Sequence, residues 1–251
     1  MSGFLARVRD LLHLVLSGRM RRMWRALTSR FYSDSASLGL RRDLAIAFPE
    51  PPAKRPVQVR PLAPSDELSW LDVHEPGLSG DQVYARLGQL RLLHAAIATC
   101  HVALDPDGQP CYMQWLIPAK ENDRVRAFFG NLYPHLAPDE ALLEGAYTPE
   151  AYRGQGIMAC AMAQIAERAR PLGVRWVITF VDETSVPSLK GCAKAGFVPY
   201  VRRLESFRLF RRRISFVPII MKEAGAPGPL AEEQTQRRAQ GESRQGADQR
   251  G

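Results

Sequence analysis

The sequence predicts one α+β domain in which helices flank a mixed, mostly antiparallel central sheet. Its 251 residues are enough for one substantial core and too few for three independent domains. Hydrophobic residues make up 45% and charged residues 24%, ordinary globular values that exclude a wholly disordered chain. Between residues 57 and 220, strand patterns alternate with helical periodicities, and they include an antiparallel hairpin and a single strand–helix–strand unit.

The first half of the domain is built around the hairpin. Its turn, Asp105-Pro106-Asp107-Gly108, has proline at the second position and glycine at the fourth, as a β-turn favours. Apolar segments on both sides complete the pattern of a β-hairpin. In chain order we expect a strand at 57–62, helices at 65–73 and 83–93, hairpin strands at 96–104 and 109–117, and a helix at 121–129.

The second half contains the strand–helix–strand unit and ends in two strands. Residues 211–213, all arginine, are expected to form a charged turn between those last strands. In chain order we expect a strand at 141–148, a helix at 154–170, a strand at 175–181, a helix at 187–195, and strands at 197–209 and 214–220.

Residues 1–48 are predicted to form a basic helical arm outside the domain. Residues 1–43 carry nine arginines and three acids, a local charge of +6. Two interpretations of the arm stay open: it packs on its own domain or on the second subunit of a homodimer, or residues 1–32 rest on anionic lipid at the inner face of a membrane. We do not expect a nucleic-acid partner. The apolar helix face that suggests these contacts is Met20, Met23, Trp24, Leu27 and Phe31.

A proline-rich linker and a polar tail bound the domain, which we expect at 57–222. Six prolines lie between Pro49 and Pro64, and each fixes φ and removes a backbone donor. A continuous helix is therefore excluded, and residues 49–56 are predicted to be the linker. Residues 223–251 contain one large aliphatic side chain, Leu230, which predicts a disordered tail.

The chain is predicted to be a cytoplasmic protein without a metal ion. Its longest apolar run near the N-terminus, residues 11–16, is far shorter than the ~20 residues of a membrane span, and no signal-cleavage pattern follows it. Its cysteines show neither a CxxC pair nor a Cys/His metal spacing, so we expect reduced thiols. These cysteines are Cys100, Cys111, Cys160 and Cys192.

A glycine-rich turn at residues 153–158 opens the helix expected at 154–170. Glycines at the mouth of a helix let backbone amides approach a ligand, and the helix dipole favours an anion such as pyrophosphate. The loose GxGxxG/A dinucleotide fingerprint also matches here. However, residues 148–153 separate the strand from the first glycine, and Asp182 lies 28 residues beyond Gly154 rather than about 20. We therefore set a Rossmann fold aside.

The turn resembles the signature R/Q-x-x-G-x-G/A of the GNAT superfamily of acetyl-CoA-dependent N-acetyltransferases. Arg153 and Gly156 match it, whereas Met158 stands where the family has glycine or alanine. The resemblance continues in Ser188 and in the segment Lys194-Ala195-Gly196-Phe197, and it covers roughly residues 57–220.

This resemblance implies acetyl-CoA as a co-substrate, with its pantothenate arm between two splayed strands and its pyrophosphate on the turn. Ser185 falls on the position of a family asparagine, and Ser188 lies on the same helix. The cofactor-binding residues it implies are Ala146, Tyr147, Arg153, Gly154, Gln155, Gly156, Ile157, Met158, Ser185 and Ser188.

The implied reaction is direct attack of a primary amine on the thioester, which requires a base and an acid. Glu144 is our candidate base, because desolvation can raise the pKa of a carboxylate; the alternative is a paired or solvent-facing acid. Cys192 stands where the family often has tyrosine, so it is the candidate acid, with helix packing as its alternative role.

The acceptor stays open between a small-molecule amine, a lipid-linked amine and a protein N-terminus. Two other functions also stay open: a catalytically silent CoA-binding module, and a membrane-associated adaptor that uses the basic arm.

Overall fold

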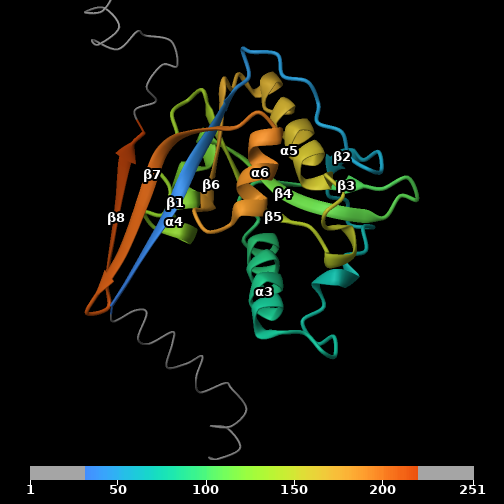
Figure 1. Ribbon diagram of the computed structural model, residues 1–251, viewed down its shortest axis with the longest axis horizontal. Helices are drawn as coiled ribbons and strands as arrows, with labels where there is room; N and C mark the ends of the chain where they lie inside the picture. The colour runs from blue at the N-terminus through green and yellow to red at the C-terminus, as the bar shows by residue number, and fades with distance from the viewer. Residues whose placement is uncertain (1–31, 220–251) are drawn as a thin grey trace, which may run out of the picture. The chain divides into compact units, whose positions relative to one another are not determined.

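The computed structural model describes residues 32–219, which form an eight-stranded sheet with helices on both faces (Figure 1). The strand order is β2-β3-β4-β5-β6-β1-β7-β8, and within this sheet only β5 and β6 pair in parallel. The strands are β1 (Tyr32–Asp43), β2 (Gln58–Pro61), β3 (Thr99–Leu104), β4 (Pro110–Pro118), β5 (Glu140–Tyr147), β6 (Trp176–Asp182), β7 (Val198–Arg208) and β8 (Arg211–Pro218). The helices are α3 (Gly80–Ala95), α4 (Asn122–Phe129), α5 (Ile157–Glu167) and α6 (Val186–Lys194), with short 3-10 turns at Ser69–Leu71, Ala119–Glu121, Glu150–Tyr152 and Arg170–Leu172.

Two apolar cores lie on opposite faces of the sheet. On one face, α5 packs against the strands, so that Ile165 of the helix and Leu143 of β5 belong to the same buried cluster. On the other face, Leu92 of α3 and Val125 of α4 belong to a cluster with Trp115 of β4. The middle strands β4, β5 and β6 are thus held from both sides.

Within residues 32–219 no helix is long and apolar enough to cross a membrane.

Side-chain hydrogen bonds explain where the predicted elements begin and turn. The Ser79 hydroxyl accepts from the Gln82 amide at 3.3 Å, and the Gln82 side chain accepts from the Ser79 amide at 2.6 Å, a capping box that starts α3. In the β3–β4 hairpin, the Asp105 carboxylate accepts from the amides of Asp107 and Gln109 at 3.0 and 2.9 Å. The predicted hairpin is confirmed.

The expected order of elements after residue 57 is confirmed, with two local errors. Residues 65–73 form no α-helix, because the Asp66 carboxylate accepts from the Ala63 amide at 2.7 Å and pairs with Arg60, which holds the segment in a turn. Residues 211–213 lie within β8, and Leu209 and Phe210 make the turn before it.

The predicted helical arm is wrong for residues 32–43, which form β1 between β6 and β7. Hydrogen bonds to both neighbouring strands satisfy the polar backbone of β1. Leu40 faces the core under α5, and Gly39 faces β7 so closely that a Cβ there would lie 2.4 Å from Val201 Cγ1. The helical face expected at residues 19–31 and the tail expected at 223–251 lie outside the described residues.

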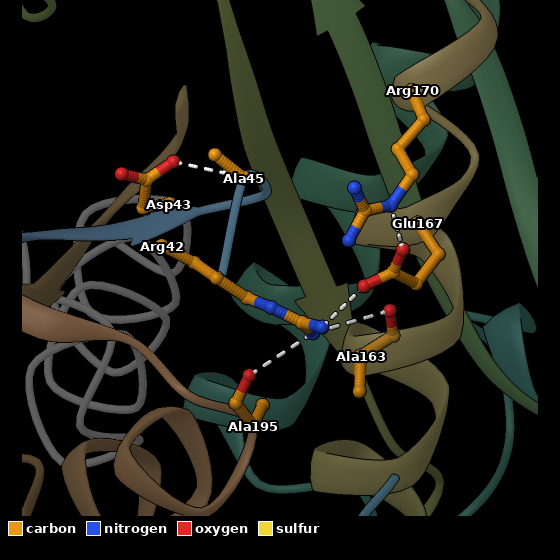
Figure 2. Close-up of polar contacts among 7 residues, drawn as sticks. All are labelled: Arg42, Asp43, Ala45, Ala163, Glu167, Arg170 and Ala195. Atoms are coloured by element: carbon orange, nitrogen blue, oxygen red, sulfur yellow. Dashed lines mark hydrogen bonds and ion pairs between the residues drawn. The ribbon is translucent and has the colours of Figure 1, made fainter. Parts of the chain in front are cut away.

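Arg42 fastens β1 to the two helices α5 and α6 (Figure 2). Its side chain is 2% exposed, and Nη1 donates to the carbonyls of Ala163 and Ala195 at 3.4 and 3.2 Å while Nη2 pairs with Glu167. Burial lowers the pKa of Arg42, and the charge of Glu167 opposes that effect. A cation beside the last carbonyls of α6 also suits its negative dipole end. Arg42 therefore fixes the spacing of two helices that border the site described next.

Candidate active site

Strands β5 and β6 pair at their beginnings and then diverge. Their parallel register joins Glu140, Ala141 and Leu142 to residues 176–178, although β5 runs on to Tyr147 and β6 to Asp182. In the described chain no register pairs these two strands further along. Unpaired backbone amides and carbonyls along such a gap can bond a ligand. The gap that the family resemblance implied is present.

A β-bulge at Gly145 bends β5 where the gap begins. Trp115 of β4 pairs with Glu144 and Met113 pairs with Tyr147, so β5 holds one residue more than β4 over this interval. Gly145 has a φ of 68°, and a Cβ there would lie 2.7 Å from Trp115 Cε3. Sequence reasoning missed Gly145, although a glycine inside a strand pattern signals such a bulge.

A cleft of about 800 Å³ opens beside this gap, and residues of α3, β4, β5, α5, β6 and α6 line it. Every predicted site residue except Gln155 is among the lining residues. They are Glu144, Ala146, Tyr147, Arg153, Gly154, Gly156, Ile157, Met158, Ser185, Ser188 and Cys192.

The glycine turn presents a row of unpaired amides at the start of α5. Gly154 and Gly156 have φ angles of 72° and 80°, which side chains with a Cβ rarely adopt. The Cys160 amide is bonded to the Gly156 carbonyl at 3.2 Å, but the amides of residues 154–159 have no acceptor among residues 32–219. No side chain caps α5. Such a helix start favours an anion.

Three cationic side chains line the cleft. Arg153 donates through Nε to the Thr148 carbonyl at 3.1 Å and pairs with Glu150 at 3.2 Å, so its position is fixed. Lys190 and Lys194 of α6 also line the cleft; sequence reasoning named Lys194 only within the segment 194–197 and did not name Lys190. Positive charge at a cleft attracts an anionic ligand.

The predicted linker packs against the outer side of the turn. The Lys54 amide donates to the Gln155 carbonyl at 2.8 Å, and the Gln155 side chain donates to the Ala151 carbonyl at 2.9 Å, so Gln155 bonds outside the cleft. A Cβ on Gly156 would lie 2.9 Å from the Pro52 carbonyl oxygen. Glycine at position 156 therefore serves this packing as well as the turn.

Glu144 places a carboxyl group of altered acidity in the cleft. Burial raises its pKa, while the Tyr133 hydroxyl, the Gly145 amide and the charge of Arg203 oppose that rise. Arg203 of β7 is itself held by the Ser37 hydroxyl at 2.9 Å. Sequence reasoning missed Tyr133 and Arg203, which approach Glu144 only in the folded chain.

The remaining candidates lie at the α6 side of the cleft. Cys192 is fully buried, its sulfur lies 3.8 Å from that of Met162, and burial raises the pKa of the thiol to about 12. Cys192 thus remains protonated at neutral pH. The Ser185 hydroxyl donates to the Ser188 hydroxyl at 2.9 Å where α6 begins.

Several solved structures resemble the chain. An acetyltransferase of the GNAT family from Colwellia psychrerythraea has 15% identity and a TM-score of 0.46, with 74% of this chain and 61% of that chain covered. A GCN5-related N-acetyltransferase from Sphaerobacter thermophilus has 16% identity and a TM-score of 0.43, with 74% and 56% covered. A tandem GNAT protein from the clavulanic acid biosynthesis pathway has 18% identity and a TM-score of 0.44, with 74% and 56% covered. The chain thus spans less than two thirds of the length of each.

Sequence comparison identifies the family. No curated protein matches the chain significantly. The model of the Acetyltransferase (GNAT) family matches residues 68–197, which are 130 of the 251 residues and include β3 to α6 with the whole glycine turn. Since this match spans more than half of the sequence, the chain belongs to the GNAT acetyltransferase family.

Proposed function

We propose that the protein transfers an acetyl group from acetyl-CoA to a primary amine by direct attack in a ternary complex. One observation carries the proposal: the gap between β5 and β6 and the unpaired amides of residues 154–159 border one cleft. Membership of the GNAT family supports acyl transfer from CoA.

The residues of the cleft fit acetyl-CoA by their chemistry. A diphosphate suits the unpaired amides of residues 154–158 and the charges of Lys190 and Lys194. The backbone of Ala146 and Tyr147, next to the gap, would bond the amide groups of the pantetheine arm. Ser185 and Ser188 offer hydroxyls nearby. When bound, acetyl-CoA supplies an activated acyl thioester.

Glu144 is the proposed base. Its raised pKa increases its proton affinity, whereas the Tyr133 hydroxyl and the charge of Arg203 favour the carboxylate form. In the proposed role, a Glu144 oxygen takes the proton of the attacking amine, directly or through water. The same group lines the cleft beside Ala146, where an acceptor amine can approach the gap.

Cys192 is a weaker proposal as the acid. A thiol with a pKa of about 12 donates a proton poorly near neutral pH, and its complete burial suits packing against Met162. This observation favours a second candidate function, a CoA-binding module without turnover. The candidate acceptors are a small-molecule amine, a lipid-linked amine and a protein N-terminus, which the amine panel below compares.

The cofactor site is tested by calorimetry with acetyl-CoA and a matched pair of variants. Gly154 and Gly173 both have positive φ, at 72° and 75°, and a Cβ on either meets nothing within 4 Å, but only Gly154 lines the cleft. Gly154→Ala and Gly173→Ala therefore impose similar backbone strain. We expect binding on the order of tenfold weaker for Gly154→Ala, as when one anion contact is lost, and unchanged binding for Gly173→Ala. Equal affinities for both variants would refute the assignment of the turn.

Turnover is tested by the release of free CoA thiol over a panel of primary amines. Amine-dependent release supports the transferase. Binding of acetyl-CoA without release across small-molecule, lipid-linked and peptide amines supports the silent module instead. Cys192→Ala should retain activity if the residue only packs, and activity that falls without loss of folding would restore it as the acid.

A further inference from the structure

The turn between β7 and β8 places large apolar side chains where the backbone disfavours them. Leu209 and Phe210 form the two-residue turn with φ angles of 50° and 64°. Hairpin turns with two positive φ angles are usually made by asparagine and glycine, because a larger side chain is strained there. Leu209 is 67% and Phe210 61% exposed. Most of both apolar side chains is therefore exposed.

Charge at the same place breaks a second rule of hairpin design. Arg208 and Arg211 stand directly opposite each other at the end of the ladder, and like charges in that position repel. Arg208 pairs with Asp34 at 2.8 Å and lies 3.9 Å over the ring of Tyr32. Arg211 and Arg213, in contrast, form no ion pair within residues 32–219. We call Tyr32 and residues 208–213 the hairpin tip.

A basic hollow of about 890 Å³ adjoins the hairpin tip. Its arginines are Arg202, Arg208, Arg212 and Arg213, and the acids Asp34 and Glu205 line it as well. Three of these arginines pair with acids, Arg202 with Glu183, Arg208 with Asp34 and Arg212 with Glu205. Arg213 forms no ion pair within residues 32–219, so its guanidinium is the lining group that best suits a phosphate oxygen.

We propose that the hairpin tip docks on an anionic phospholipid membrane, with Leu209 and Phe210 in the interface and Arg211 and Arg213 at lipid phosphates. Apolar side chains surrounded by cations match a surface whose interior is apolar and whose boundary is anionic. Tyr32, 64% exposed, offers the amphipathic ring typical of such boundaries. A nucleic acid would satisfy the arginines but not Leu209, and a symmetric second copy would oppose arginine to arginine. The proposal does not depend on acetyl transfer.

The test reports on the hairpin tip itself, in the full chain. The four native cysteines are buried, so Leu209→Cys provides a single accessible thiol for an environment-sensitive fluorophore. Leu172→Cys is the control, because Leu172 is 54% exposed but lies after α5, remote in sequence from the hairpin. With phosphatidylcholine vesicles containing phosphatidylglycerol, we expect the label at position 209 to brighten and shift to shorter wavelength, and the label at position 172 to stay unchanged. An unchanged signal at position 209 on vesicles that bind the protein would overturn the proposal.

Vesicle flotation of the full chain measures the charge contribution. Arg211→Gln and Arg213→Gln should each weaken binding to the anionic vesicles about fivefold, whereas the exposed helix residue Arg91→Gln should not. Binding to vesicles of phosphatidylcholine alone should be weaker for the wild type. Flotation of the Arg211 and Arg213 variants equal to that of the wild type would mean that the tip contacts no lipid. A change in their oligomeric state without a change in flotation would mean the same.

Discussion

Two arginines in neighbouring strands each interact with a glutamate, on opposite faces of the sheet. One interaction is an ion pair and the other is an effect of charge alone. Arg42 on β1 donates to the carbonyls of Ala163 and Ala195 and pairs with Glu167 (Figure 2). Arg203 on β7 acts on Glu144 only through its charge, beside the Tyr133 hydroxyl. The first arrangement pairs a buried cation with a carboxylate and fixes two helices. The second leaves a carboxyl group of raised pKa in a cleft, which is an arrangement suited to proton transfer.

The largest expected contrast is between the two glutamates. Glu144→Gln removes the proposed base and should lower kcat by about 10²–10⁴-fold, the usual contribution of general base catalysis. Glu167→Gln changes a residue outside the cleft and should leave kcat close to wild type. Steady-state kinetics at saturating acetyl-CoA measures both. A fully active Glu144→Gln variant would show that the amine loses its proton without this residue.

The next contrast concerns stability. Arg42→Met removes the donor to the carbonyls of Ala163 and Ala195 and leaves Glu167 with Arg170 as its remaining partner, and it should cost about 2–3 kcal/mol of unfolding free energy. The matched control is Arg175→Met, which breaks an exposed pair with Asp43 at 3.1 Å and should cost less than about 1 kcal/mol. Urea denaturation distinguishes the two. Similar losses in both variants would mean that burial of Arg42 adds nothing.

Local patterns determined most of what the sequence could predict about the fold. The hairpin depends on Asp105 and its neighbours, and the glycine turn on residues 153–158, so each is visible in a few consecutive residues. Strand β1 could not be recognised in this way, because serine, aspartate and glycine give it weak strand propensity. Its partners, residues 176–182 and 198–208, lie far along the chain. Only Leu38 and Leu40 suggest the alternation of apolar and polar residues that is typical of a strand. The next inward position holds Arg42 instead of an apolar residue.

The candidate site divides along the same line. Arg153 and Gly156 could be placed from the turn motif, and Glu144 from its place on the strand before that turn together with the family resemblance; all three line the cleft. The groups that set the acidity of Glu144 could not, since Tyr133 comes from a loop after α4 and Arg203 from β7. A motif also does not show how deeply Glu144 is buried, and burial is what raises its pKa.

A smaller effect should appear in the pH dependence of turnover. The charge of Arg203 favours the ionised form of Glu144 and lowers its pKa, so Arg203→Met should raise that pKa and move the acid limb of the kcat profile to higher pH. Arg202 neighbours Arg203 on β7, and Arg202→Met, which breaks only an exposed pair with Glu183, serves as the control. An acid limb that stays in place for Arg203→Met would exclude Glu144 as the titrating group.

The smallest expected effect is that Glu144→Gln stabilises the folded protein relative to the wild type, by an amount that grows with pH. Because burial raises the pKa of Glu144 in the folded protein, folding favours its protonated form, and this stability is fully present below the unfolded value of about 4.3. It is lost as the pH rises from the unfolded value through the folded pKa, so a glutamate at position 144 costs stability at higher pH. Glu144→Gln should therefore raise the Tm at neutral pH but not at pH 4. Glu167→Gln should lower the Tm instead, because it leaves the buried guanidinium of Arg42 without a counter-charge. Tm changes of opposite sign at neutral pH would show that Glu167 stabilises the fold and that Glu144 destabilises it. Tm changes of the same sign would contradict this difference between the two glutamates.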